Sequence, residues 1–117
     1  SISTSRQIIS PESASYVLKA LQEVVQDGTA PAANIKGFSV AGKTGTAHQI
    51  RGRSGYAEDL YIASFAGITP LSDESLTIFV SINNPGLNSY TGGAVAAPVF
   101  AKIAESSLNH LGYFEDE

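Results

Sequence analysis

The chain has 117 residues, which is enough for one domain or for part of a larger one. Hydrophobic residues make up 43% of the chain and charged residues 15%, so we expect a packed core rather than wholesale disorder. The net charge of −4 argues against a nucleic-acid surface, and the absence of cysteine excludes disulfides, thiolate metal sites and cysteine nucleophiles.

The sequence also offers little for a metal site or a membrane span. The two histidines, His48 and His110, lie far apart in the chain, so a histidine-based metal cluster is not expected. No apolar run approaches the ~20 residues that cross a bilayer, and no basic segment followed by an apolar one opens the chain. If the natural protein is exported or anchored, we expect that segment to lie outside these residues.

The first predicted element is a helix that begins at Ser10-Pro11-Glu12 and ends at Asp27-Gly28. Ser10 can cap the helix, Pro11 fits its first position, and Glu12 suits the positive end of the helix dipole. Apolar residues then recur at spacings of three and four, which predicts one buried face. That face consists of Ala14, Val17, Leu18, Leu21, Val24 and Val25.

Three strands are predicted next, at residues 38–50, 60–68 and 76–83. A polar loop at 51–58 and a turn at 69–75 join them, and such short connections predict an antiparallel meander. The third strand is almost entirely apolar and β-branched, so we expect it to be central and covered on both faces. A sheet of three strands has two open edges, and we therefore expect this strand to pair with one outside the 117 residues.

A second helix is predicted from Ala94 to about Leu111, after a loop that contains Tyr90-Thr91-Gly92-Gly93. Pro98 is tolerated in its first turn and Gly112 ends it. The residues expected on its buried side are Val95, Val99, Phe100, Ile103, Ala104, Leu108 and Leu111. The order helix, three strands, helix predicts an α+β fold in which both helices pack on an antiparallel sheet.

The residues with the most chemistry are Lys43-Thr44-Gly45-Thr46, inside the first predicted strand. Side chains alternate along a strand, so Lys43 and Gly45 face one way while Thr44 and Thr46 face the other. The ammonium supplies charge, the hydroxyls supply hydrogen bonds, and the glycine lets a ligand approach the backbone. These features suit a site for an anion; the plain alternative is an ordinary strand with a solvated lysine.

Lys43-Thr44-Gly45 matches the third of the motifs shared by penicillin-binding proteins and serine β-lactamases, namely Ser-x-x-Lys, Ser-x-Asn and Lys-Thr-Gly. Its surroundings include Gly28-Thr29-Ala30 before it, and the segments 61–67, 82–85 and 90–100 after it. This succession resembles the C-terminal part of the transpeptidase domain of class B penicillin-binding proteins. The division-specific (septal) transpeptidase of Gram-negative bacteria is the nearest likeness, and the resemblance runs from about Ile9 to the tail.

The resemblance implies a serine acyltransferase that cross-links peptidoglycan. The family's serine attacks a D-Ala-D-Ala peptide, releases the terminal D-Ala and passes the acyl group to an amine, and β-lactams acylate the same serine. The implied fold is the penicillin-binding and serine β-lactamase-like one, with three strands here of a larger five-stranded sheet. Residues 1–117 would then be a C-terminal fragment of the transpeptidase domain, acting on the periplasmic face of the inner membrane.

The resemblance also implies the partners. They are the peptidoglycan stem peptide ending in D-Ala-D-Ala, β-lactams, the missing N-terminal half of the same domain, and membrane proteins of the division machinery. No cofactor, metal or nucleic acid is implied.

Carried over by motif, Lys43 would set the electrostatics of the site and assist proton movement. Thr44 and Thr46 would hold the carboxylate of the substrate or drug, and the backbone N–H of Thr46 would be one of two oxyanion-hole donors. Gly45 would keep the strand open for the ligand backbone, which requires this strand to be an edge with Lys43 pointing into the cleft.

Tyr90 and Gly92-Gly93 match the family's aromatic-Gly-Gly loop, which borders the cleft. His48 stands where relatives often carry a basic residue, and we interpret it as a surface strand histidine rather than a catalytic one.

The chain departs from the family pattern because it contains no Ser-x-x-Lys. Ser81-Ile82-Asn83 fits Ser-x-Asn by letter but follows the Lys-Thr-Gly element, so we interpret it as ordinary strand sequence. The nucleophile, its lysine partner and one oxyanion donor are therefore missing, and we expect the chain alone to be inactive.

Two alternatives remain at this point, a non-catalytic binding module and a fragment of a serine β-lactamase. The intact Lys43–Thr46 set argues against the module, and residues 90–100 look more like the transpeptidases.

Overall fold

The computed structural model describes residues 4–50, 56–86 and 90–115, and for residues 50 and 56–59 it describes the backbone alone. The elements follow one another as expected for an α+β fold. In chain order they are α1 (Pro11–Gln26), the 3-10 turn η1 (Pro31–Ala33), β1 (Ala41–Ile50), β2 (Tyr56–Thr69), β3 (Leu76–Asn83), the π-helical turn η3 (Gly92–Ala96) and α2 (Ala97–Leu111).

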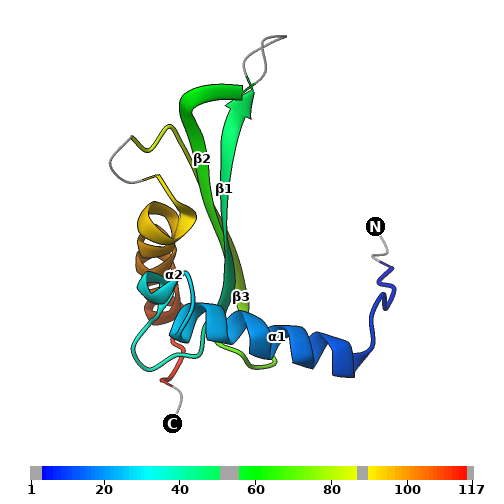
Figure 1. Ribbon diagram of the computed structural model, residues 1–117. Helices are drawn as coiled ribbons and strands as arrows, with labels where there is room; N and C mark the ends of the chain where they lie inside the picture. Colours follow the sequence, from blue (N-terminus) through cyan, green and yellow to red (C-terminus); the bar gives the residue numbers. More distant parts are fainter. Residues whose placement is uncertain (1–3, 51–55, 87–89, 116–117) are drawn as a thin grey trace.

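The three strands form one antiparallel sheet in the order β1-β2-β3, which confirms the predicted meander. Thr44 lies opposite Phe65, and Thr46 lies opposite Ala63, so the register of the motif strand is fixed against β2. A register shift between His48 and Ile50 interrupts this pairing. Beyond it, β1 and β2 continue as a ribbon that extends past the helices (Figure 1).

Helix α2 packs on one face of the sheet, and its central contact is between two aromatic rings. Phe65 of β2 and Phe100 of α2 are both fully buried, with ring centroids 4.8 Å apart. Gly67 makes this approach possible, because a Cβ at that position would collide with the Phe100 ring. The core extends from this pair to Val25, Val80, Ala104 and Leu108, among other residues.

Helix α1 begins and ends where its sequence signals predict. The Ser10 hydroxyl accepts a hydrogen bond from the Ser13 N–H at 3.1 Å, and Pro11 occupies the first helical position. The predicted face is the less exposed side of this helix, with Val25 buried and Ala14, Leu18, Leu21 and Val24 half-buried, but the prediction is wrong for Val17, which is 48% exposed. The start of α1 projects away from the sheet (Figure 1), so only its C-terminal end meets the core.

Helix α2 starts at Ala97 rather than Ala94, because the preceding turn is π-helical. Its end is as predicted, with Gly112 in the left-handed region at a φ of 77°. Its buried stripe is Ala97, Phe100, Ala104 and Leu108, whereas three residues predicted to be buried are exposed, namely Val99, Ile103 and Leu111. The difference arises because one sheet face covers only one narrow stripe of a helix.

The strand predictions are confirmed in type and corrected in extent. β1 begins at Ala41 rather than residue 38, because Phe38 bridges to Ile35 around Gly37, which has a φ of 87°. β2 begins at Tyr56, so residues 56–58 of the predicted loop belong to a strand, while residues 51–55 lie outside the described residues.

Strand β3 has the predicted bounds, but the expectation that both its faces are covered is wrong for the described residues. Thr77, Phe79 and Ser81 are exposed, whereas Val80 on the opposite face is buried. The order β1-β2-β3 makes β3 an edge strand of the described sheet, and α2 packs on its Val80 face. The pairing of β3 with a strand outside the chain stays a prediction.

Candidate active site

Strand β1 is an edge of the described sheet, as the motif requires, and it presents two threonines to a hollow. The hollow has a volume of about 410 Å³ and is lined by Thr29, Thr44, Thr46, Thr91, Gly92 and Gly93. We call these six residues the threonine hollow. Thr44 and Thr46 line it while Lys43 and Gly45 do not, which confirms the predicted alternation of the strand.

The predicted glycine loop lies directly against β1 and β2. Gly92 is buried, and a Cβ there would clash with the carbonyl oxygen of Ser64 and the backbone of Gly45. This close approach brings the Gly92 N–H to the Thr46 hydroxyl oxygen, to which it donates at 3.1 Å. Glycine is therefore required at position 92 for the contact that orients Thr46.

Thr91 holds the same loop in shape. Its hydroxyl oxygen accepts a hydrogen bond from the Ala94 N–H at 3.2 Å, which caps the π-helical turn. The turn leads directly into α2, so the buried helix that packs on the sheet also fixes the position of the glycine loop.

The Thr44 hydroxyl belongs to a small polar network at one wall of the hollow. Thr44 Oγ1 lies 3.2 Å from Thr29 Oγ1, and either hydroxyl can donate in this pair. The Lys43 ammonium donates to the Thr44 carbonyl oxygen at 3.2 Å and to the Thr44 hydroxyl at 3.4 Å. Lys43 does not line the hollow, so the expectation that it points into the cleft is not met, and its ammonium reaches the Thr44 hydroxyl instead.

The Gly45 backbone contacts both Ser64 of β2 and the glycine loop. The Ser64 hydroxyl donates to the Gly45 carbonyl oxygen at 3.4 Å, and a Cβ at Gly45 would press on that hydroxyl. The Gly92 backbone lies close to Gly45 as well. A side chain at Gly45 would therefore disturb the packing of β1 on β2 at Ser64.

Tyr90 stands in an aromatic row next to the hollow. Its ring stacks on Tyr61 of β2 with centroids 4.1 Å apart, and Tyr61 meets His48 edge-to-face at 4.6 Å. His48 is exposed, in agreement with its interpretation as a surface strand histidine. Tyr90 is 37% exposed, so it keeps part of its ring available beside the threonine hollow.

The sequence prediction missed four contributors to this site, namely Thr29, Ser64, Thr91 and Tyr61. Thr29 follows the end of α1, and the sequence signal for it is only its place in Gly28-Thr29-Ala30. Ser64 and Tyr61 are recognisable only through the register of β2 against β1. Thr91 could have been found, because a threonine three residues before a free backbone N–H is a typical cap.

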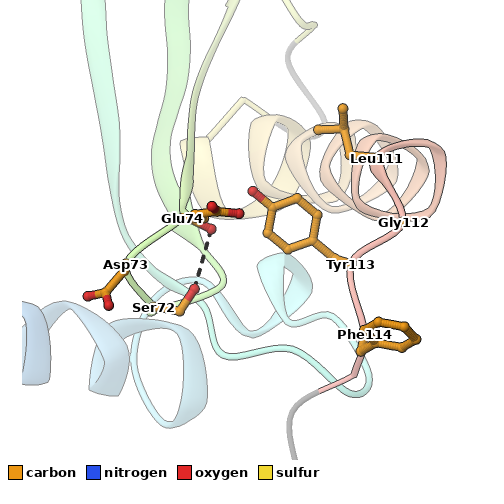
Figure 2. A pocket seen from close by; sticks show the side chains of 7 residues that line it. All are labelled: Ser72, Asp73, Glu74, Leu111, Gly112, Tyr113 and Phe114. Atoms are coloured by element: carbon orange, nitrogen blue, oxygen red, sulfur yellow. Dashed lines mark hydrogen bonds between the residues drawn. The ribbon is translucent and has the colours of Figure 1, made fainter.

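A second hollow lies between the turn after β2 and the end of α2 (Figure 2), with a volume of about 490 Å³. Asp73 and Glu74 stand on one side of it, and Tyr113 and Phe114 on the other. It begins at the far end of α2, a 15-residue helix that spans about 22 Å. None of the predicted site residues line it, so we place the candidate site at the threonine hollow.

Within the part of the chain that the structure describes, no three His, Asp or Glu side chains are grouped so that they could hold a metal ion. The helices described are too short or too polar to span a bilayer.

Comparisons with known proteins agree with this geometry. Residues 3–105 match the family described as "Penicillin binding protein transpeptidase domain". Stage V sporulation protein D of Bacillus subtilis is 40% identical over 107 residues, which are 92% of this chain and 16% of that protein. Peptidoglycan D,D-transpeptidase FtsI of Buchnera aphidicola is 36% identical over 105 residues, 89% of this chain and 18% of that protein.

Solved structures show the same likeness. The transpeptidase domain of penicillin-binding protein 3 from Burkholderia pseudomallei superposes with a TM-score of 0.80 and 37% identity. The match covers 92% of this chain and 33% of that one. The chain thus spans only a small part of the proteins that it matches.

Proposed function

The chain belongs to the family of penicillin-binding protein transpeptidase domains, and on that premise we propose that it is the C-terminal part of the domain of a peptidoglycan D,D-transpeptidase. The observation that carries the proposal is the threonine hollow on an edge strand. Two hydroxyls of the Lys-Thr-Gly-Thr motif line it, and the Lys43 ammonium lies 3.4 Å from one of them. Such a set suits the carboxylate at the end of a stem peptide.

The proposed reaction consists of two acyl transfers. A serine outside this chain attacks the carbonyl carbon between the two D-Ala residues. The amide C–N bond breaks, an ester forms on the serine oxygen, and the serine proton leaves with the amine of the terminal D-Ala. The amine of a neighbouring stem peptide then attacks the ester, which forms the new amide and returns a proton to the serine oxygen.

In this reaction the chain supplies one wall of the site. Thr44 and Thr46 bind the carboxylate, and the Thr46 N–H stabilises the charge that develops on the carbonyl oxygen. Lys43 provides positive charge and assists proton transfer. Among the described residues nothing pairs with the outer edge of β1, so the peptide can align along it beside Gly45.

Tyr90 and the buried Gly92 border this wall, and we assign them to the binding of the substrate. A β-lactam acylates the same serine, because opening its ring amide leaves the acyl group on the serine oxygen and the proton on the ring nitrogen. We further propose that the whole protein acts at the periplasmic face of the inner membrane, together with membrane proteins of cell division.

The test uses the whole protein that contains this chain and a fluorescent penicillin. We expect stoichiometric labelling of the wild type and at least a hundredfold slower labelling of Lys43→Ala, because a preorganised charge at the reacting group is lost. Lys102→Ala is the matched control, since Lys102 is an exposed lysine on α2, and its labelling should stay within about twofold of the wild type.

The 117-residue chain alone should not be labelled. Labelling of the isolated chain at one of its own serines would contradict the proposal, as would a whole protein that takes up no label. Rapid turnover of a chromogenic cephalosporin by the whole protein would instead identify a β-lactamase.

A further inference from the structure

The two motif hydroxyls in the threonine hollow, those of Thr44 and Thr46, both accept hydrogen bonds from other groups of the protein. The Thr46 oxygen accepts from the Gly92 N–H at 3.1 Å. A hydroxyl has one hydrogen to donate and two lone pairs to accept with, and an N–H can only donate. The Gly92 N–H therefore occupies a lone pair of Thr46 and leaves the hydroxyl hydrogen free to point at an anion in the hollow.

Thr44 has the corresponding arrangement, but a side chain provides part of it. The Lys43 ammonium, which can only donate, lies 3.4 Å from Thr44 Oγ1, and Thr29 Oγ1 lies 3.2 Å away. When Thr44 donates its hydroxyl hydrogen to an anion, the Thr29 hydroxyl becomes the donor in the hydrogen bond between Thr29 and Thr44. Both motif hydroxyls are then turned toward the ligand with their oxygens satisfied.

The backbone holds Thr29 in position from two sides. The next residue, Ala30, is fully buried, and its N–H donates to the Val24 carbonyl oxygen of α1 at 3.1 Å. On the other side the Thr29 carbonyl oxygen lies so close to Gly93 that a Cβ there would collide with it. Thr29 thus connects the end of α1, the motif strand and the glycine loop.

We propose that Thr29 is a positioning residue for the transpeptidase reaction. Its hydroxyl orients the Thr44 hydroxyl so that Thr44 donates to the carboxylate of the acyl donor. Thr29 acts through Thr44, lies 15 residues before it in the sequence, and is outside the Lys-Thr-Gly-Thr motif. The inference rests on the proposed function and adds a residue that discriminates in favour of anionic acyl donors.

The test compares acylation of the whole protein by a β-lactam that carries a free carboxylate and by its methyl ester. Thr29→Val keeps the shape of the side chain and removes the hydroxyl. We expect it to slow acylation by the acid about three- to tenfold, because the hydrogen bond from Thr44 to the carboxylate is weakened when Thr44 loses its partner. The rate with the ester should change by less than about twofold, so the acid-to-ester ratio falls.

Two variants complete the design. Thr29→Ser keeps the hydroxyl and should recover most of the acid-to-ester ratio. Thr4→Val makes the same chemical change in the exposed segment before α1 and should leave the ratio unchanged. If Thr29→Val does not fold, Thr29→Ala carries the same comparison.

A ratio that stays at the wild-type value in the hydroxyl-free variant would overturn the inference, whether both rates fall together or neither changes. Equal losses would mean that Thr29 only supports the loop. The proposed function fails in a different way, because in that case the wild-type protein is acylated by neither compound.

Discussion

The two edges of the sheet differ in what they expose. The β1 edge carries lysine, glycine and threonine, and its hydroxyls are held by Gly92 and Thr29. The β3 edge carries no charged residue and no proline between Leu76 and Asn83, and it exposes Phe79 at 67%. Natural proteins protect a free edge with charges, proline or a covering element. The comparison shows a polar β1 edge beside a hollow and an apolar β3 edge, and the pairing of β3 with a strand outside the chain stays a prediction.

Packing explains how one sheet has such different edges. The β3 residues that face α2 join the core, with Val80 buried and Ile78 and Ile82 partly buried. On β1 the corresponding space next to the motif is filled by the glycine loop, which enters α2 through η3. Thr91, Gly92 and Gly93 of this loop line the hollow together with Thr44 and Thr46, so the loop forms one of its walls.

The largest expected effect is on the β1 edge, where Gly92→Ala would displace the glycine loop from the motif strand. The added methyl group collides with the Ser64 carbonyl oxygen and the Gly45 backbone, so we expect the free energy of unfolding to fall by about 1–3 kcal/mol. The Gly92 N–H also moves away from Thr46, and acylation of the whole protein should fall at least tenfold.

Thermal unfolding and penicillin labelling measure these two effects. Ala94→Ser, at an exposed position of the same turn, is the control and should change stability by no more than about 0.5 kcal/mol. Wild-type labelling of Gly92→Ala would show that the contact between Gly92 and Thr46 does not matter for the reaction.

The β3 side is tested with Phe79→Lys in the isolated chain. An exposed apolar edge strand associates with other chains, and a charge on it opposes that association. We expect the wild-type chain to self-associate in sedimentation experiments and Phe79→Lys to reduce the associated fraction by about half or more. Tyr16→Lys is the control, because Tyr16 is 78% exposed on α1 but belongs to no sheet edge. An equal reduction in both variants would assign the effect to net charge instead of the edge.

The smallest expected effect compares two serines that are paired on adjacent strands. Ser64 pairs with Gly45 on one side and with Ser81 of β3 on the other. Ser64→Ala removes the hydrogen bond to the Gly45 carbonyl oxygen, and we expect a loss of about 0.5–1 kcal/mol in unfolding free energy. Ser81→Ala, at an exposed position of β3, should cost less than about 0.5 kcal/mol. Urea unfolding of both variants measures the difference. A larger loss for Ser81→Ala would show that the hydrogen bond from Ser64 to Gly45 is not the more important of the two serine contributions.

Much of the fold could be predicted because its boundaries depend on a few neighbouring residues. Ser10 and Pro11 begin α1, and Gly112 ends α2, by hydrogen bonds and backbone angles within one turn. The bounds of β3 followed from an uninterrupted β-branched run. The motif residues and the edge position of their strand followed from the resemblance, and Thr44 and Thr46 do line a common hollow.

The remaining features depend on contacts between segments that are far apart in the sequence. The exposure of Val99 and Ile103 depends on which stripe of α2 meets Phe65, and helical spacing alone cannot choose between neighbouring stripes. The exposure of Thr77, Phe79 and Ser81 depends on α2 packing on the opposite face of β3. An apolar strand has the same sequence pattern whether one or both of its faces are covered.

The sequence by itself determined the elements, their order and the chemistry concentrated at Lys43-Thr44-Gly45-Thr46, because capping, strand propensity and side-chain type are local properties. Only the tertiary structure brought Thr29 to Thr44 and Gly92 to Thr46. Those contacts exist because α2 packs on β2 and draws the glycine loop onto the motif strand, and because the end of α1 anchors the loop that carries Thr29. The hollow is therefore a product of packing, formed around residues that the sequence had already made suitable for an anion.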